Sequence, residues 1–250
     1  MNGHKIIEPV KWDSDFFGMK IGKTRLDGKF NRLGFTGELD KGQFDLIYGT
    51  SNTGQPVSGC WERLGFYFVD CMITLSMDFD AKRYGHLNYE RCDNLLKEDI
   101  NACYAISEAV APVSRFYRER AIGEELTKKL YRKWVDTALD GTFSDCLLVE
   151  RVKGRVAGIN AVRTEKDAGV CTLIGVDKEF RGKGIGRKLW DQAFAYWALN
   201  ARGIGSVKVK FSAGNASAFG FYIAMGFDKV DKVDYIYHYS KSGQRPAKIS

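Results

Sequence analysis

The chain has 250 residues, of which 44% are hydrophobic and 28% charged, and it carries a net charge of +7. This composition is typical of a soluble globular protein with one large or two small domains, and no apolar run is long enough to span a bilayer. The positive charge favours anionic ligands, but the sequence has no long basic run and no helix-turn-helix or RNP pattern, so we expect neither a nucleic-acid nor a membrane partner.

The N-terminal part of the chain differs from the rest because it carries no glycine-rich phosphate loop. Met1–Lys11 lacks the basic start and apolar core of a secretory signal, which favours a cytoplasmic location. Strand-like runs then extend over Phe17–Leu26, Phe44–Thr50 and Phe66–Met77, with a helix between them. We therefore assign residues 1–100 to a smaller domain of their own.

A weak internal repeat links the two halves of the chain. Ser51-Asn52-Thr53 leads to Leu64-Gly65-Phe66 and Val69-Asp70, and a similar order runs from Asn215 to Met225-Gly226-Phe227 and Val230-Asp231. An aromatic-rich strand follows in both copies. The pattern favours a degenerate half-copy of the C-terminal unit, and chance similarity of two helix–Gly–Phe–strand units is the alternative.

Residues 101–250 predict a regular succession of elements. Apolar residues at helical spacing indicate a helix over Glu124–Leu139. Strands follow over Cys146–Val152 and Arg155–Thr164, joined by a Lys153-Gly154 hairpin turn, and a third strand covers Val170–Val176. A helix over 184–202, a strand around 207–211, a short helix capped by Asn215 and a final strand over 233–239 complete the order.

The most informative stretch is the glycine-rich turn Arg181-Gly182-Lys183-Gly184-Ile185-Gly186, which stands between a strand and a helix. Glycines accept backbone angles closed to other residues, so successive N–H groups can converge on one anion at the positive end of a helix dipole. Arg187 and Lys188 add positive charge. The spacing excludes a Walker loop, and Arg187 stands where a Rossmann loop needs its third glycine. The turn therefore predicts a pyrophosphate site of another kind.

The cysteines and histidines form no recognisable metal or nucleophile pattern. Six cysteines stand at positions 60, 71, 92, 103, 146 and 171, without C-x-x-C pairs or histidines at ligand spacing. We interpret them as reduced structural residues and expect no metal. His4, His86 and His238 lack any supporting constellation, and we interpret them as surface or turn residues.

Arg181, Gly184 and Gly186 resemble the acyl-CoA signature R/Q-x-x-G-x-G/A of the GNAT N-acetyltransferases, and the order of the predicted elements matches the core of that superfamily. The resemblance implies a mixed α+β fold whose mostly antiparallel central sheet is flanked by helices. It also implies acetyl-CoA as the cosubstrate. Residues 101–250 would form the catalytic domain, and residues 1–100 a truncated GNAT-like domain.

Segments spread over nearly the full length resemble the bacterial dTDP-fucosamine acetyltransferases. These segments are Trp12–Gly18, Ser51–Gly54 with Leu64–Phe66, Ser114–Phe116, Gly141–Phe143 and Gly214–Tyr222. Enzymes of that family N-acetylate a dTDP-linked amino-dideoxyhexose for surface polysaccharide such as O-antigen or capsule. The resemblance implies a 3- or 4-amino sugar nucleotide as acceptor and a homodimer.

The turn and the resemblance together assign the residues that hold acetyl-CoA. Arg181 through Lys188 are expected to bind its pyrophosphate, and the backbone of Ile174, Gly175 and Val176 to pair with the pantetheine arm. Asn215 would add a side-chain hydrogen bond. The Val176 N–H would stabilise the oxyanion of the tetrahedral intermediate.

Tyr222 occupies the position where many GNAT enzymes place a general acid, so the resemblance assigns it protonation of the leaving thiolate. The alternative is a core tyrosine packed against Met225 and Phe227. Residues 170–176 contain no carboxylate, although many GNAT enzymes carry a glutamate base there. Asp177 is interpreted as a turn residue, and no general base is assigned.

Ser114-Arg115-Phe116-Tyr117 precedes the helix predicted over Glu124–Leu139, where the superfamily places its acceptor lid. Arg115 is expected to pair with the dTDP pyrophosphate, and Phe116 or Tyr117 to stack on thymine. A surface connector is the alternative. Asn160 is a further candidate for acceptor binding.

Two other functions compete with the sugar-nucleotide acetyltransferase. One is acetylation of another amine, such as a protein N-terminus or an antibiotic, which would leave the N-terminal segments unexplained. The other is a non-catalytic acyl-CoA-binding regulator, against which an intact turn together with Tyr222 argues.

Overall fold

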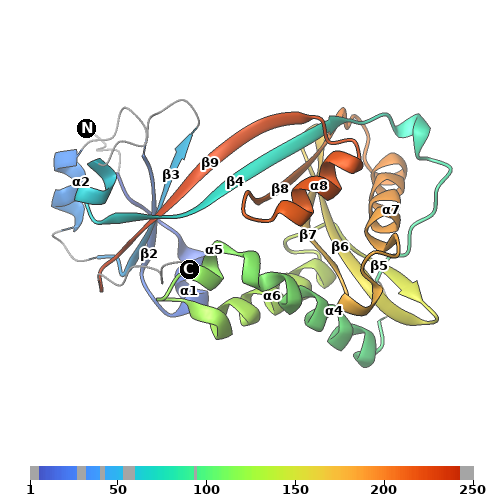
Figure 1. Ribbon diagram of the computed structural model, residues 1–250, viewed down its shortest axis with the longest axis horizontal. Coiled ribbons are helices and arrows are strands. Elements are labelled where there is room, and N and C mark those ends of the chain that lie inside the picture. Colours follow the sequence, from blue (N-terminus) through green and yellow to red (C-terminus); the bar gives the residue numbers. More distant parts are fainter. Residues whose placement is uncertain (1–5, 27–31, 40–42, 53–59, 93–94, 243–250) are drawn as a thin grey trace.

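The structure, a computed structural model, describes residues 6–26, 32–39, 43–52, 60–92 and 95–242 (Figure 1). Its strands belong to one nine-stranded sheet. The strands are β1 Glu8–Pro9, β2 Ile21–Arg25, β3 Leu46–Asn52, β4 Phe66–Asp78, β5 Cys146–Val152, β6 Arg155–Glu165, β7 Ala168–Val176, β8 Ser206–Ser212 and β9 Lys229–Ser240. The helices are α1 Lys11–Phe17, α2 Arg32–Leu39, α3 Cys60–Arg63, α4 Lys97–Val110, α5 Arg115–Arg118, α6 Gly123–Leu139, α7 Ile185–Asn200 and α8 Ala216–Ala224.

The sheet is mostly antiparallel and does not follow chain order. Its strands lie in the order β1-β2-β3-β9-β4-β8-β7-β6-β5, with parallel pairing only between β2 and β3 and between β7 and β8 among the described strands. The last strand, β9, is inserted between β3 and β4. In Figure 1 the long β4 and β9 run side by side across the whole molecule and join its two ends.

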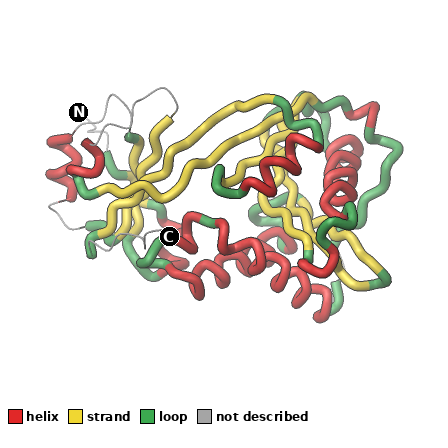
Figure 2. Tube along the Cα trace, viewed as in Figure 1, coloured by secondary structure: helices red, strands yellow, loops and turns green. Residues whose placement is uncertain are grey.

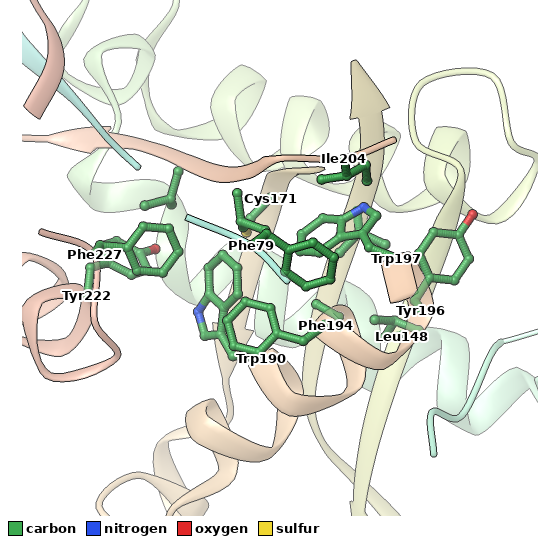
Figure 3. Close-up of a cluster of buried hydrophobic side chains, with 14 of the residues drawn as sticks. Phe79, Leu148, Cys171, Trp190, Phe194, Tyr196, Trp197, Ile204, Tyr222 and Phe227 are labelled. Atoms are coloured by element: carbon green, nitrogen blue, oxygen red, sulfur yellow. The ribbon is translucent and has the colours of Figure 1, made fainter. Parts of the chain in front are cut away.

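Helices cover the two faces of the β5–β8 part of the sheet. On one face, Trp190 and Trp197 of α7 are fully buried against a cluster that includes Cys171 of β7 (Figure 3). On the other face, Ile106 of α4 and Val135 of α6 pack in a cluster with β5, β6 and β7. Cys171 and Leu173 of β7 are two positions apart, so regular alternation would place them on one face. The pairing of β7 with β6 shifts by one residue between them, which is why they belong to clusters on opposite faces.

The predicted mixed α+β fold with a mostly antiparallel sheet flanked by helices is confirmed. The strand predicted over Phe17–Leu26 is wrong at its start. Phe17 ends helix α1, Gly18 caps that helix in the left-handed conformation, and β2 begins only at Ile21. Helix α4 escaped prediction, and α5 follows it, so the Ser114–Tyr117 segment lies between two long helices.

The proposed boundary near residue 100 falls inside α4, and β4 from the first part lies between β9 and β8 from the second. The division into two domains stays a prediction.

The two segments of the internal repeat have the same local form. Each has a strand, then a helix, then a glycine with positive φ (Gly65, +88°; Gly226, +98°), then a buried phenylalanine at or near the start of the next strand. Thr53 and Gly54 of the first copy lie outside the described residues. The strands that end the two copies, β4 and β9, pair with each other.

Candidate functional site

Strands β7 and β8 separate from each other at a β-bulge. They pair in parallel only from Ala168↔Ser206 to Cys171↔Val209. On its other side β7 pairs with β6, and there Cys171 faces Val162 while Leu173 faces Ala161, so Thr172 is an extra residue. A bulge bends its strand and increases the local twist. The bend therefore directs the rest of β7 away from β8 and leaves a gap between them.

The backbone of β7 beyond the bulge faces this gap. The Asp177 N–H donates to the Ala157 carbonyl at 2.9 Å, which makes Gly158↔Val176 a non-hydrogen-bonded pair of the antiparallel ladder. The N–H and C=O of Val176 consequently point away from β6. Because such pairs alternate, the polar groups of Ile174 point the same way. The Arg181 Nε donates to the Val176 carbonyl at 3.1 Å, which leaves the Val176 N–H as the donor at the strand end.

The glycine turn closes one end of the gap. Gly182 and Gly184 have φ of +72° and +79°, in the left-handed region that favours glycine, and Gly184 is the N-cap of α7. The sequence implied that Gly186 adopts a backbone angle closed to other residues, but the structure shows that its small size matters instead. It lacks a positive φ, but a Cβ at this position would lie 3.0 Å from Phe221 Cζ, so its small size lets α8 approach α7.

One cavity of about 1570 Å³ runs from the turn across the gap and onward to α1 and α5. Arg181, Gly182, Gly184, Gly186 and Arg187 line it at the turn, together with Ile185. At its other end it reaches Trp12, Asp13, Arg115 and Phe116. Pockets for a single drug-sized molecule have about 300–1000 Å³. The cavity is therefore large enough for two substrates.

Tyr222 lines the cavity from α8 and is 4% exposed. Its ring contacts Phe211, Trp190 and Phe227, with centroids 5.1, 6.2 and 5.7 Å away, and Figure 3 shows it at one end of the aromatic cluster. Its hydroxyl makes no hydrogen bond to the described residues. Burial raises the pKa of Tyr222 well above its usual value near 10, with a smaller contribution from Cys171. The phenol is consequently protonated at neutral pH.

Two of the lysines predicted to bind the cofactor point elsewhere. Lys188 Nζ pairs with Glu150 Oε1 at 2.9 Å, and Lys183 Nζ donates to the Glu179 carbonyl at 2.8 Å. Neither lines the cavity. Asn215 does line it, and its Oδ1 accepts the Ala218 N–H at 3.1 Å as the N-cap of α8.

The predicted acceptor residues divide in the same way. Arg115 and Phe116 line the cavity, and the guanidinium carbon of Arg115 lies 4.5 Å from the centroid of the Phe116 ring. Arg115 Nε is buried and has no hydrogen-bond partner within the described part of the chain. Tyr117 does not line the cavity. Asn160 is fully buried, donating from Nδ2 to the Leu189 carbonyl and accepting from the Cys171 thiol, so it faces α7 instead.

Asp70, Ser212 and Trp134 are among the cavity-lining residues that the sequence analysis did not predict. Asp70 on β4 is 2% exposed, and Ser212 at the end of β8 donates to it at 2.7 Å. Trp134 of α6 lines the same cavity. Asp70 left a signal in the sequence, because it is the one carboxylate within the apolar run from Phe66 to Leu75. A charged residue inside such a run requires a partner or a function.

Glu119, Tyr67 and His238 form a buried hydrogen-bond network. Glu119 accepts hydrogen bonds from Tyr67 at 2.7 Å and from His238 Nδ1 at 2.6 Å. His238 is fully buried, which corrects its interpretation as a surface or turn residue. Burial lowers the pKa of His238. Burial alone would raise the pKa of Glu119, but hydrogen bonds from His238 and Tyr67 hold the pKa of that carboxyl below its usual value. A neutral imidazole therefore donates to a carboxylate.

The cysteines show no reactive environment. Cys103, Cys146 and Cys171 are buried, and burial raises the pKa of the Cys171 thiol to about 12. The side chain of Cys60 lies outside the described residues. Within the described ranges, no group of three or more His, Cys, Asp or Glu side chains could hold a metal ion. None of the described helices is long and apolar enough to cross a membrane.

Residues 142–229 match the family model described as "Acetyltransferase (GNAT) domain". This segment contains β5 to β8, the glycine turn, α7 and α8, and therefore the turn, the gap and Tyr222. Residues 142–229 are thus similar to a GNAT acetyltransferase domain. The comparison with curated proteins gives no match.

Solved structures resemble the chain beyond this segment. A GCN5-related N-acetyltransferase from Sphaerobacter thermophilus has a TM-score of 0.55 and 15% identity, covering 92% of this chain and 75% of its own. A tandem GNAT protein from the clavulanic acid biosynthesis pathway has a TM-score of 0.55 and 14% identity, covering 91% and 76%. A GCN5-related glucosamine N-acetyltransferase region of a fungal GH3 beta-N-acetylglucosaminidase has a TM-score of 0.55 and 15% identity, covering 88% of this chain and 30% of its own. At these identities the likeness shows the fold alone.

Proposed function

We propose that the protein transfers an acetyl group from acetyl-CoA to the amino group of a dTDP-linked 3- or 4-amino-dideoxyhexose. The observation that carries acetyl transfer is the single cavity that joins the glycine turn, the gap between β7 and β8, and Tyr222. The match of residues 142–229 to a GNAT domain supports the same chemistry.

Acetyl-CoA would lie along the gap. Its pyrophosphate would bind at the turn, where Gly184 begins α7 and the positive end of the helix dipole favours an anion. Arg181 and Arg187 line the cavity there and supply compensating charge. The pantetheine arm would form hydrogen bonds with the backbone N–H and C=O of Ile174, as an additional strand beside β7 would.

The reaction joins the acceptor nitrogen to the acetyl carbon and breaks the carbon–sulfur bond. The Val176 N–H would donate to the oxyanion that forms on the acetyl oxygen. Tyr222 would protonate the departing sulfur, because it lines the cavity and its phenol is protonated at neutral pH. The nitrogen loses one proton in the same cycle, so the products are an amide and the CoA thiol.

Three features of the far end of the cavity support a sugar nucleotide as acceptor. Arg115 has a buried Nε without a hydrogen-bond partner among the described residues, and its guanidinium suits bidentate contact with a phosphate. Trp12 is 46% exposed, lines the cavity and stacks on Phe16, so a base could stack on its free face. The third is the resemblance of Trp12–Gly18 and Ser114–Phe116 to the dTDP-fucosamine acetyltransferases, which also supports a sugar nucleotide. A homodimer, a cytoplasmic location and a place in surface-polysaccharide synthesis follow from the resemblance alone.

Thiol release from acetyl-CoA, measured against a panel of dTDP- and UDP-linked 3-amino and 4-amino dideoxyhexoses, tests this function. Saturable turnover of one dTDP-linked sugar is the expected result. Turnover of a peptide N-terminus or a small antibiotic amine, with none of any sugar nucleotide, would assign a different acceptor. Acetyl-CoA binding without turnover of any amine would favour a regulatory module.

A further inference from the structure

Asp70 is a buried carboxylate that lines the cavity and is only half satisfied by the protein. Its Oδ1 accepts the Cys71 N–H at 2.8 Å and the Ser212 hydroxyl at 2.7 Å, and Arg118 Nη1 lies 3.7 Å away. Its Oδ2 is buried and has no hydrogen-bond partner among the described residues. A buried carboxylate oxygen without a donor is unfavourable, so the site is suited to a ligand that brings one.

The carboxylate of Asp70 lies beside the end of β8, where it bonds Ser212. Ser212 is the last residue of β8, the strand that forms one wall of the gap, and it pairs with Met72 of β4. Asp70 stands two residues before Met72. Met72, Ser212 and Asp70 all line the cavity. The carboxylate thus lies next to the strand end past which an acceptor must approach the thioester.

The other carboxylates that line the cavity are less suited to this task. Glu165 forms an ion pair with Arg163. Asp13 lies on α1 at the opposite end of the cavity from the glycine turn, near Trp12. Strand β7 carries no carboxylate between Val170 and Val176. Asp70 is therefore the candidate that fills the role of the missing base.

We propose that Asp70 Oδ2 binds the acceptor amine and takes the proton that its nitrogen loses. This inference rests on the proposed acetyl transfer and names the residue that selects an amine. The neutral amine donates an N–H hydrogen bond to Oδ2, which directs the nitrogen lone pair toward the acetyl carbon. When the carbon–nitrogen bond has formed, one N–H proton passes to Oδ2, the carbon–sulfur bond breaks and the sulfur takes the Tyr222 proton. The carboxyl proton then returns to solvent, and Tyr222 is reprotonated from solvent.

The internal repeat supplies a matched control. Asp231 follows Val230 as Asp70 follows Val69, and Asp231 also accepts a serine hydroxyl, that of Ser76, and pairs with a cation, Lys208. Asp231 does not line the cavity. Asp231 is exposed, so Asp231→Asn makes the same chemical change outside the cavity and without reaching the acceptor.

The test compares Asp70→Asn and Asp231→Asn with the wild type, using the dTDP-amino sugar that the wild type turns over. We expect Asp70→Asn to lower kcat/KM about 100-fold or more, the range of general acid–base catalysis, with acetyl-CoA affinity within threefold of wild type. Asp231→Asn should retain wild-type kcat/KM. Equal kcat/KM for Asp70→Asn and wild type would overturn the role of Asp70 and leave the proposed function standing. Absence of wild-type turnover with every amine would overturn the proposed function and this inference with it.

A second measurement uses only the unmodified protein, in case Asp70→Asn does not fold. In the presence of CoA, calorimetry compares the amino sugar nucleotide with the analogue that carries a hydroxyl in place of the amine. A hydroxyl donates one hydrogen, and an amine donates two while offering a more basic atom, so we expect the amine to bind at least tenfold more tightly. Equal affinity for the two compounds would overturn the assignment of Oδ2 to the amine.

Discussion

Replacement of Tyr222 by phenylalanine removes one oxygen atom and leaves the surrounding packing unchanged. The ring keeps its contacts with Phe211, Trp190 and Phe227. The hydroxyl makes no hydrogen bond to the described residues, so its loss should cost less than the about 1 kcal/mol that a protein hydrogen bond contributes to stability. The transition state, by contrast, loses its proton donor. General acids contribute about 10²- to 10⁴-fold, or roughly 3–5 kcal/mol of activation free energy.

We therefore expect Tyr222→Phe to lower kcat by at least about 100-fold while thermal stability and acetyl-CoA affinity stay near wild type. Assays of thiol release give kcat, and calorimetry gives the affinity for acetyl-CoA. Tyr196→Phe is the matched control, because Tyr196 is buried in the same aromatic cluster but does not line the cavity. Turnover of Tyr222→Phe within threefold of wild type would refute the general-acid role and leave Tyr222 as a core residue.

Three further predictions test the turn and the buried network. Gly184→Val places a branched side chain at a residue with φ of +79°, which costs about 1–2 kcal/mol. Acetyl-CoA binding, measured by calorimetry, should therefore weaken about tenfold. Unchanged affinity would contradict the need for this backbone conformation. Arg181→Ala should weaken acetyl-CoA binding about tenfold, because it removes roughly one charge-assisted hydrogen bond to the ligand. Lys188→Ala should change the affinity less than twofold, because Lys188 pairs with Glu150. Equal effects of the two substitutions would show that Lys188 turns toward the ligand. Burial lowers the pKa of His238, so the unfolded chain takes up a proton near pH 6.5 that the folded protein excludes, and stability should be full above that pH and fall below it. Urea unfolding between pH 7.5 and 5.0 measures this fall, which should be smaller in His238→Asn; the same slope in both proteins would remove His238 as its cause.

The local sequence determined the C-terminal elements and the position of the glycine turn. The bounds of β5 agree with the prediction, and those of β6, β7, α6 and α7 agree within two residues. These elements are specified by short-range periodicity and by glycines whose backbone angles no other residue accepts readily. Residues 11–17 show the limit of this approach, because no helix was predicted there and the predicted strand began at Phe17, whereas Gly18 ends a helix.

The tertiary structure decided which side chains meet. Arg187 and Lys188 are adjacent in sequence, but neighbouring residues on a helix point about 100° apart, so one lines the cavity while the other reaches Glu150. The insertion of β9 between β3 and β4 follows from pairing between distant strands, which no local pattern specifies. The pairing of β4 with β8 brings Asp70 to Ser212 across 142 positions. Sequence alone thus located the glycine turn, whereas the part of the cavity around Asp70 exists only because distant strands share one sheet.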